Sequence, residues 1–572
     1  PTGTGKTLAY VVPALIWAAR HGLRVGIATY TRALQEQAMV REVPRALRAL
    51  ARAGLQPTPR VALLKGRENY LCWRSFQPLR PQKDDDAETW LAWAVVLTFA
   101  VTQRDGDLDR LSTTPPMGLT SSKPYRQALG QLLRSARARR GCCTHPRDRA
   151  TCLAELARRR AERSHLVVTN QSFALARRDF LHHIIFDECE HLHDGAVSAF
   201  SSSFDFREAR QVLMRLHRPG RGRSRAVLDR MRRRLPATDA GEEAMKRALA
   251  RWQRVMRGVE ALENAAEDFE RRRWEGNAES GDRNVHGYMR IQVQEGREAG
   301  LLIARTELGA EMARLESDLD RLQEICDTNP MRGSQSIRQG LELGGAEVVA
   351  LGEQLDSWLP LNNGRPSFSK NKFYDIERSH FGDLSLLSKV LLPHEALGRL
   401  YYPALASGTF LSATTYLGGS FEASKNYLGL ARTEEPDEDE ERGGRPVATY
   451  RVPEAFDYSR VLVGVPRDAP PANGSREEHR AFIARFIEQL SVRTGGRLLV
   501  LFTSLQDVRE VGEAVLPILR KRGLPLYYQG MEGMAKEELS RLFLERTDSI
   551  LLGVDTFWFG ADFPGETLQY LA

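Results

Sequence analysis

The sequence lacks several features that define common protein classes. It contains no run of about 18 apolar residues, so no membrane-spanning helix is predicted. Its first residues do not have the pattern of a secretory signal peptide, and we expect a cytoplasmic location. Six cysteines among 572 residues are too few for a secreted protein held together by disulfides. Because several of them are clustered, they indicate a metal site instead.

The composition allows sizeable cores and favours an acidic partner. Hydrophobic residues make up 42% of the chain, and its length predicts about three or four domains. The formal net charge of +8 favours a polyanion such as nucleic acid, although an arginine-rich composition alone gives the same bias. No cluster of acidic residues typical of a nuclease is evident.

The first stretch, PTGTGKTLAYVVPAL, has the pattern of a phosphate-binding loop that leads into a helix. Backbone N–H groups of such a loop bind phosphates at the N-terminus of the helix. We predict that Lys6 reaches the β- and γ-phosphates of ATP and that the Thr7 hydroxyl holds Mg²⁺. The predicted nucleotide-binding residues are Thr2, Gly3, Thr4, Gly5, Lys6 and Thr7.

The second candidate element of the nucleotide site is acidic and lies in HHIIFDECEHL, residues 182–192. Its apolar part predicts a buried strand that ends at Asp187 and Glu188. We predict that Asp187 binds Mg²⁺ and that Glu188 accepts a proton from the attacking water. A strand ending in two acids is also found on ordinary surfaces, so it is the phosphate-binding loop upstream that favours catalysis. The predicted catalytic residues are Lys6, Asp187 and Glu188.

Three later stretches also read as strands that end in polar loops: TFLSATT (409–415), GRLLVLFTSLQDVREV (496–511) and SILLGVDTFWFGADFPGETL (549–568). Strands that alternate with helices predict parallel sheets. Ligands of such sheets bind beyond the carboxyl ends of the strands.

In this order the motifs resemble those of superfamily 2 helicases. The stretches IATYTRALQEQ (27–37), LKGRENYLC (64–72) and TQRDGDL (102–108) make the chain similar to the DinG-like branch of the XPD/DinG iron–sulfur DNA helicases. The resemblance implies an α/β fold with two RecA-like P-loop motor lobes, and an iron–sulfur insertion and a helical arch insertion in the first lobe. It also implies a monomer that unwinds DNA from 5′ to 3′ in repair or replication. Its partners would be single-stranded DNA and a forked duplex.

The expected domain organisation follows from the positions of the motifs. The helical spacing of Arg, Glu, Leu and Ala after the acidic strand favours long amphipathic helices there. The expected parts are a first lobe at 1–204 with a cysteine insertion at about 65–162, an arch-like insertion at 205–395, a return to the first lobe at 396–431, an acidic linker at 432–446 and a second lobe at 447–572.

The resemblance assigns a [4Fe–4S] cluster to four cysteines. Cys72 and Cys152 match the first and last positions, and Cys142 and Cys143 are the available middle pair. Four thiolates are what such a cluster requires. The adjacent middle cysteines depart from the usual family spacing, and His145 is an alternative to one of them. Zinc held by the same side chains, and a site that has lost its metal, remain open.

Family position also suggests which residues couple hydrolysis to movement and which contact the strand. Arginines around the cysteines, Arg134 and Arg137 among them, are placed either to grip phosphates or simply to face solvent. The coupling candidates are Ser412, Thr414, Gly560 and Asp562, and the nucleic-acid candidates are Thr29, Thr31, Thr503 and Ser504.

The chain departs from the family pattern at several positions. Glu190 stands where the family has the His of Asp-Glu-Ala-His, Phe559 replaces a usual Glu, and TNQ (169–171) stands where Asn-His is common. Because glutamate cannot donate as histidine does, we expect altered coupling. An ATP-gated clamp that does not unwind, a CRISPR-associated DinG-like helicase and an RNA-directed motor therefore remain alternatives.

The last family motif, Gln-x-x-Gly-Arg-x-x-Arg, would follow Ala572, where the printed sequence ends. Its arginines stabilise charge on the transferring phosphate. We therefore expect this chain to bind ATP weakly and to hydrolyse it slowly.

Overall fold

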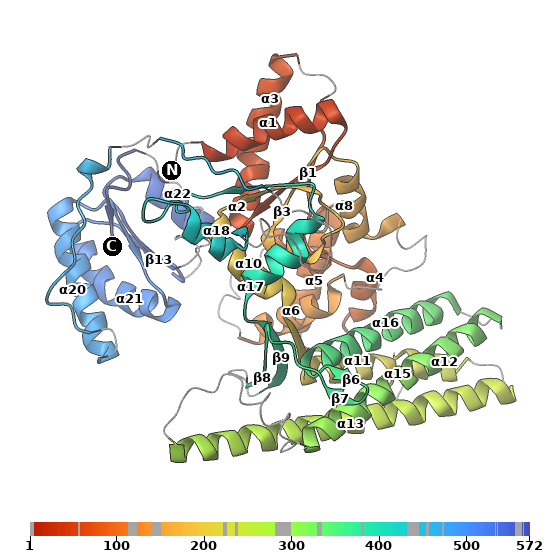
Figure 1. Cartoon of the computed structure of the whole chain (residues 1–572). Coiled ribbons are helices and arrows are strands. Elements are labelled where there is room, and N and C mark those ends of the chain that lie inside the picture. Colours follow the sequence, from red (N-terminus) through yellow and green to blue (C-terminus); the bar gives the residue numbers. More distant parts are fainter. Residues whose placement is uncertain are drawn as a thin grey trace.

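The computed structural model contains two parallel α/β sheets and a long helical segment (Figure 1). No helix among the described residues is both long and apolar enough to cross a membrane. The residues described are 5–54, 58–103, 105–111, 123–138, 150–220, 226–234, 238–280, 299–328, 334–378, 383–431, 446–453, 457–471, 474–531, 534, 536–554, 557, 563 and 565–572.

A five-stranded parallel sheet with the order β10-β4-β1-β3-β2 forms the first lobe. Its three central strands are almost wholly buried, as continuous apolar runs predict for a parallel sheet covered on both faces. Thr29 pairs with Asn170 and Asp187 with Leu411, so the strands end at one edge. The strands are β1 (Val25–Thr29), β2 (Val61–Leu63), β3 (Leu166–Asn170), β4 (His183–Asp187) and β10 (Ser407–Leu411).

Helices cover both faces of this sheet with separate apolar cores. On one face, α1 (Lys6–His21) and α3 (Val43–Arg52) pack on the strands, and α2 (Arg32–Gln37) follows β1. On the other face lie α9 (Gln171–Ala176) and α10 (Leu192–Phe200). Helix α1 starts after Gly5, whose φ of 79° is readily adopted by glycine. The helix predicted after the phosphate-binding loop is therefore confirmed.

The chain between β2 and β3, which we call the cysteine segment (residues 64–165), is mainly helical. Helices α5 and α6 pack on each other around an apolar cluster that includes Phe76, Val96 and Tyr125. Bridges between Tyr70 and Asp107 and between Leu71 and Arg137 join the ends of these elements. The helices are α4 (Trp73–Phe76), α5 (Ala87–Thr102), α6 (Lys123–Ala136) and α8 (Leu153–Glu162).

The chain between β4 and β10 contains the helical segment (residues 206–358). Helices α13 and α15 run alongside each other (Figure 1), and Arg251 of α13 bridges Glu311 and Asp318 of α15 at 2.8 and 3.3 Å. The helices are α11 (Phe206–Leu216), α12 (Val227–Arg232), α13 (Asp239–Ser280), α15 (Ala299–Thr328) and α16 (Ser334–Trp358).

The end of the expected arch region differs from the prediction of helices. Tyr374 and Ile376 are buried while their neighbours are not, and this alternation is the period of a strand. Strand β9 pairs antiparallel with β8 and with β5 from the chain just before α11. The strands are β5 (Ser202–Asp205), β6 (Leu361–Asn362), β7 (Arg365–Pro366), β8 (Lys372–Arg378) and β9 (Leu384–Val390); α17 (Pro393–Ala396) then leads to β10, and α18 (Glu422–Leu428) follows it.

The second lobe is a four-stranded parallel sheet with the order β12-β13-β11-β14. The strands predicted in GRLLVLFTS and SILLGVD are β11 and β13, so the α/β prediction is confirmed for both lobes. The elements are α20 (Arg476–Thr494), β11 (Leu498–Leu501), α21 (Leu505–Lys521), β12 (Leu526–Tyr528), α22 (Lys536–Glu545), β13 (Ile550–Gly553) and β14 (Tyr570–Leu571).

Two adjacent glycines before β11 provide a matched test of this sheet. Gly495 and Gly496 have φ values of 69° and 86°. A Cβ at Gly496 would lie 2.2 Å from the carbonyl oxygen of Asp548, whereas a Cβ at Gly495 would meet nothing within 4 Å. We expect Gly495→Ala to cost about 1–2 kcal/mol of left-handed strain, and Gly496→Ala to cost clearly more. Hydrogen exchange of β11 and β13 measures the difference, and equal protection in both variants would contradict it.

Candidate functional site

Lys6, Asp187 and Glu188 meet at the carboxyl edge of the first sheet. The Lys6 Nζ lies 2.5 Å from Glu188 Oε1 and 3.2 Å from Asp187 Oδ1. Burial alone would lower the pKa of Lys6, but the two carboxylates outweigh it and raise the pKa above its usual value. The lysine is therefore charged at neutral pH. The three residues predicted to be catalytic are direct neighbours.

Glu188 has an unusual backbone and an unusual proton affinity. Its φ and ψ are 51° and 53°, a left-handed conformation that is sparsely populated by residues other than glycine. Burial raises the pKa of Glu188, and a hydrogen bond with Glu190 raises it further, while Lys6 acts in the opposite direction. A raised pKa makes this carboxylate a stronger proton acceptor near neutral pH.

Two buried side chains fix the loop that carries the carboxylates. The Tyr10 hydroxyl of α1 donates to Asp187 Oδ2 at 2.8 Å, and burial raises the pKa of Tyr10. The Gln171 Nε2 of α9 donates to the backbone carbonyl oxygens of Asp187 and Glu188, at 2.9 and 3.1 Å. Sequence reasoning did not single out Tyr10. It marked TNQ (169–171) as a departure from the family pattern but assigned Gln171 no contact, because neither residue belongs to a motif of charged side chains.

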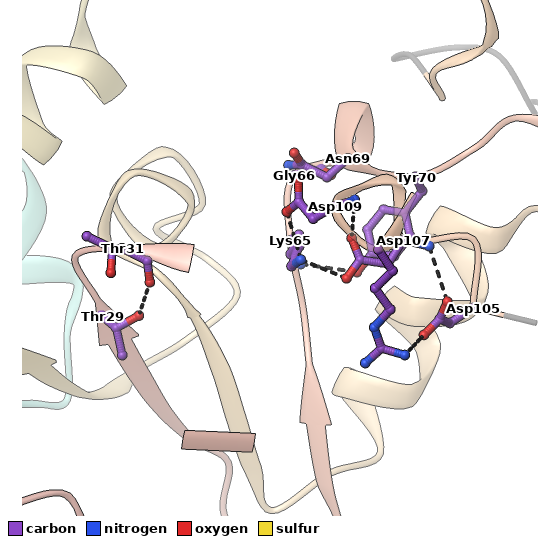
Figure 2. A network of polar contacts seen from close by, with 10 residues as sticks. Thr29, Thr31, Lys65, Gly66, Asn69, Tyr70, Asp105, Asp107 and Asp109 are labelled. Carbon is purple, nitrogen blue, oxygen red and sulfur yellow. Dashed lines mark hydrogen bonds and ion pairs between the residues drawn. The ribbon is translucent and has the colours of Figure 1, made fainter. Parts of the chain in front are cut away.

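The loop after β1 contacts the segment that follows Asp187 and Glu188. The ring of Tyr30 stacks on the ring of His191, with centroids 4.0 Å apart and planes 16° from parallel. The Thr29 side chain is buried, and its hydroxyl donates to the Thr31 carbonyl, as Figure 2 shows. The Thr31 hydroxyl accepts from the backbone N–H of Leu34 and so caps α2. The hydroxyls of both threonines are thus used within the chain.

The other candidate residues lie at the ends of their strands. The Ser412 hydroxyl accepts from the backbone N–H of Thr414 at 2.9 Å, in an exposed turn after β10. Thr503 is exposed, and Ser504 accepts from the N–H of Asp507 to cap α21. The remaining candidates, Thr2, Gly3, Thr4, Gly560 and Asp562, lie outside the described residues.

A charged network fastens the start of the cysteine segment. The Lys65 Nζ lies 2.7 Å from Asp107 Oδ2 and 2.8 Å from Asp109 Oδ2 (Figure 2). The Lys65 backbone N–H also donates to the Tyr70 hydroxyl at 3.1 Å. The stretches LKGRENYLC and TQRDGDL, which supported the family resemblance, are therefore partners in one network.

Cys72 and Cys152 are buried in the same apolar cluster, and neither forms a disulfide. The N–H of Leu71 donates to the carbonyl of Gly106, and a Cβ at Gly106 would lie 2.3 Å from Leu153 Cδ1. The neighbours of the two cysteines therefore meet at Gly106.

The middle cysteines lie in the sequence between Ala138, which bonds beside Cys72, and Cys152. The Cys72 N–H donates to the Ala136 carbonyl at 2.7 Å, and the Ala138 N–H donates to the Tyr70 carbonyl at 2.8 Å. Cys142, Cys143 and His145 lie outside the described residues. Within the described ranges, no group of three or more His, Cys, Asp or Glu side chains is placed to hold a metal ion. Of the four cysteines that the resemblance assigns to a cluster, the structure describes Cys72 and Cys152, both buried.

A cavity of about 1430 Å³ lies where the first lobe, the cysteine segment and the helical segment meet. Its first-lobe wall comes from α9 and α10, its cysteine-segment wall mainly from α6, and its third wall from α11 and α16. The Arg137 Nε is buried and has no hydrogen-bond partner among the described residues. The charged lining residues are Arg67, Glu68, Arg126, Arg134, Arg137, Arg177, Asp205, Arg207, Glu208 and Glu347.

Comparison with known proteins identifies relatives along nearly the whole chain. No protein-family model matches. Over 99% of its length the chain is 25% identical to the protein named 3'-5' exonuclease DinG of Bacillus subtilis, of which it covers 58%. Over 99% of its length it is also 25% identical to the ATP-dependent DNA helicase YoaA of Escherichia coli, of which it covers 77%. The chain thus spans little more than half of the first of these relatives.

A solved XPD helicase structure aligns with 97% of this chain and 80% of its own, at 10% identity and a TM-score of 0.32. The resemblance found in the motifs is confirmed by the relatives named DinG and YoaA, to which the chain is similar over nearly its whole length.

The contact between Tyr10 and Asp187 gives a testable energetic difference. Tyr10→Phe removes a hydrogen bond to a buried carboxylate, and we expect a loss of about 1.5–3 kcal/mol. Tyr401→Phe is the matched control, because the buried Tyr401 hydroxyl donates to the neutral carbonyl of Ala174 at 3.1 Å. That change should cost only about 0.5–1.5 kcal/mol. Hydrogen exchange of β4 and α9 reports both losses, and a larger loss at Tyr401 would disprove the expectation.

Proposed function

We propose that this chain is the motor of an ATP-dependent DNA helicase that moves along single-stranded DNA from 5′ to 3′. The observation that carries the proposal is the cluster of Lys6, Asp187 and Glu188 where α1 begins and β4 ends. An N-terminal helix end with a lysine binds phosphates, and two acids beside it suit hydrolysis. The relatives named as ATP-dependent DNA helicases support DNA as the substrate.

The chain's own groups define the steps of hydrolysis. ATP phosphates bind at the start of α1, and Lys6 turns from Glu188 toward them. Glu188, freed from the lysine, accepts a proton from the attacking water. Thr7 and Asp187 would hold Mg²⁺, which neutralises phosphate charge when bound. Tyr10 keeps the Asp187 carboxylate oriented throughout.

Movement requires two states that grip the strand differently. The second parallel sheet supplies the other lobe, with Thr503 and Ser504 at the end of β11 as candidate strand contacts. Binding of ATP draws the lobes together, and hydrolysis releases them. Ser412 and Thr414, which follow β10 at the same edge as Asp187, are placed to sense this change. We propose a role in DNA repair or replication, at a forked duplex, for a monomer.

The cavity is the proposed path of the strand beside the first lobe. Arginines from all three walls would contact phosphates, and Phe173 would stack on a base. Arg137 is the sharpest candidate, because a phosphate oxygen would supply the partner that its buried Nε lacks among the described residues. This path is part of the same proposal, because it presupposes that the whole protein moves along single-stranded DNA.

We further propose that Cys72, Cys142, Cys143 and Cys152 hold a [4Fe–4S] cluster. When bound, the cluster would cross-link the beginning and the end of the cysteine segment. Arg134 and Arg137 lie between Cys72 and the middle cysteines in the sequence, a short distance before Cys142, so the cluster would restrict their position along the cavity.

Binding measurements test the function without depending on turnover. We expect Lys6→Ala to lose binding of a fluorescent ATP analogue while it keeps binding to a labelled oligonucleotide. Arg137→Gln should weaken oligonucleotide binding and lower the slope of log K against log salt by about 0.7, the value for one phosphate contact on a single strand.

The matched control is Arg257→Gln, which removes the same charge from an exposed position of α13 outside the cavity. An equal loss in this control would contradict the proposed path. Single-turnover hydrolysis and strand displacement then separate a helicase from a clamp. Strand-stimulated hydrolysis without displacement would favour the clamp.

Metal analysis tests the cluster. Anaerobically purified protein should contain about four irons and four acid-labile sulfides per chain. Cys72→Ser should lose them, whereas Cys326→Ser, which changes a buried cysteine of α15, should keep them. Zinc in a folded sample, or iron that survives Cys72→Ser, would refute the assignment.

A further inference from the structure

Gln171 is the first residue of α9, and its side chain lies under the catalytic loop. It is 1% exposed, and its Nε2 uses both hydrogens, one on the Asp187 carbonyl and one on the Glu188 carbonyl. The contact is with the backbone rather than with the carboxylates. Gln171 therefore responds to the conformation of this loop rather than to its charge.

The same short helix forms a wall of the cavity. Asn170, Ser172, Phe173 and Arg177 all line it. Asn170 Oδ1 accepts from the N–H of Phe173 at 2.9 Å, so the start of α9 is rigidly capped. A displacement of Gln171 must consequently move residues that face the cavity.

Gln171 also packs on the second helix of that wall. A Cβ added at Gly195 of α10 would lie 3.2 Å from the Gln171 Cβ and 3.4 Å from its Oε1. Ser198 and Ala199, one turn further along α10, line the cavity. The amide thus touches the catalytic loop and both first-lobe helices of the cavity wall.

We propose that Gln171 is the positioning residue that couples the nucleotide site to the strand cavity. The inference deepens the proposed function and rests on it. Glu188 is held in a left-handed conformation while Lys6 pairs with its carboxylate. When ATP draws Lys6 away, the backbone of Glu188 can relax, and its carbonyl carries the Gln171 amide with it. Helix α9 then shifts its cavity residues.

The chemistry of the amide explains why this residue type suits the position. One NH₂ group donates two hydrogen bonds from a single atom, and the two carbonyls belong to consecutive residues. A histidine carries its N–H groups on separate ring atoms that point in different directions. Histidine is therefore expected to hold only one of the two carbonyls.

The test measures coupling rather than activity. Oligonucleotide affinity is determined by fluorescence anisotropy with and without a non-hydrolysable ATP analogue, and the ratio of the two dissociation constants is the coupling factor. In the wild type we expect a coupling factor of fivefold or more, and Gln171→Met should bring it close to one. The affinity for the oligonucleotide alone and the affinity for the analogue alone should each change less than about threefold. Gln171→His should retain part of the coupling.

Gln339→Met is the matched control, since it alters a buried amide of α16 that lines neither site. Folded Gln171→Met with the wild-type ratio would overturn the inference. If Gln171→Met does not fold, hydrogen exchange of wild-type residues 171–176 decides. The analogue alone should change their protection, and unchanged protection despite analogue binding would overturn the inference. A wild type that binds neither ligand would instead refute the proposed function.

Discussion

The half-buried charge of Lys6 is the constraint on which the first lobe depends. An ammonium group taken out of water needs opposite charge close by, and it finds two carboxylates, one within 2.5 Å. The lysine comes from the start of α1, and the carboxylates come from the end of β4. The parallel register of β4 with β1 and β10 places the carboxylates at the edge of the sheet where the ends of these strands meet. The same edge gathers the ends of β1 and β3, whose following residues Tyr30 and Gln171 hold the loop in place.

Both long segments leave the first sheet at this edge and return to a neighbouring strand. The cysteine segment connects β2 to β3, and the helical segment lies between β4 and β10. Because each connection joins adjacent strands, both long segments are inserted without interrupting the sheet. The Lys65 network fastens the first segment where it begins. The cavity forms where both segments face α9, so its walls belong to parts far apart in the sequence.

Side-chain patterns could predict the strand ends and the meeting of Lys6 with Asp187 and Glu188, because apolar runs and charges are visible in a sequence. Likeness to the family marked TNQ (169–171) as a departure, but no side-chain pattern could reveal what Gln171 contacts, since its partners are backbone carbonyls that every residue carries. Thr29 shows the converse case, in which a predicted contact residue has a different partner. The sequence cannot tell whether the hydroxyl of a threonine at a strand end faces solvent or, as here, bonds within the chain. The strands β8 and β9 escaped notice because they follow three long helices in a region rich in helix formers. Arg177 was missed because it lies apart in sequence from the arginines near the cysteines.

The departure at Glu190 has a consequence for proton affinity that its sequence does not suggest. Replacing a histidine beside the predicted catalytic acids removes a donor, which suggests altered coupling. In the structure, the Glu190 carboxyl contributes to the raised pKa of Glu188, after burial. A carboxylate with a raised pKa holds a proton more readily and is a better base near neutral pH. The stack of His191 on Tyr30 and the Gln171 amide meanwhile connect the same loop to the ends of β1 and β3. Under the proposed function, proton transfer and coupling would therefore be divided among Glu190, His191 and Gln171 around the same loop.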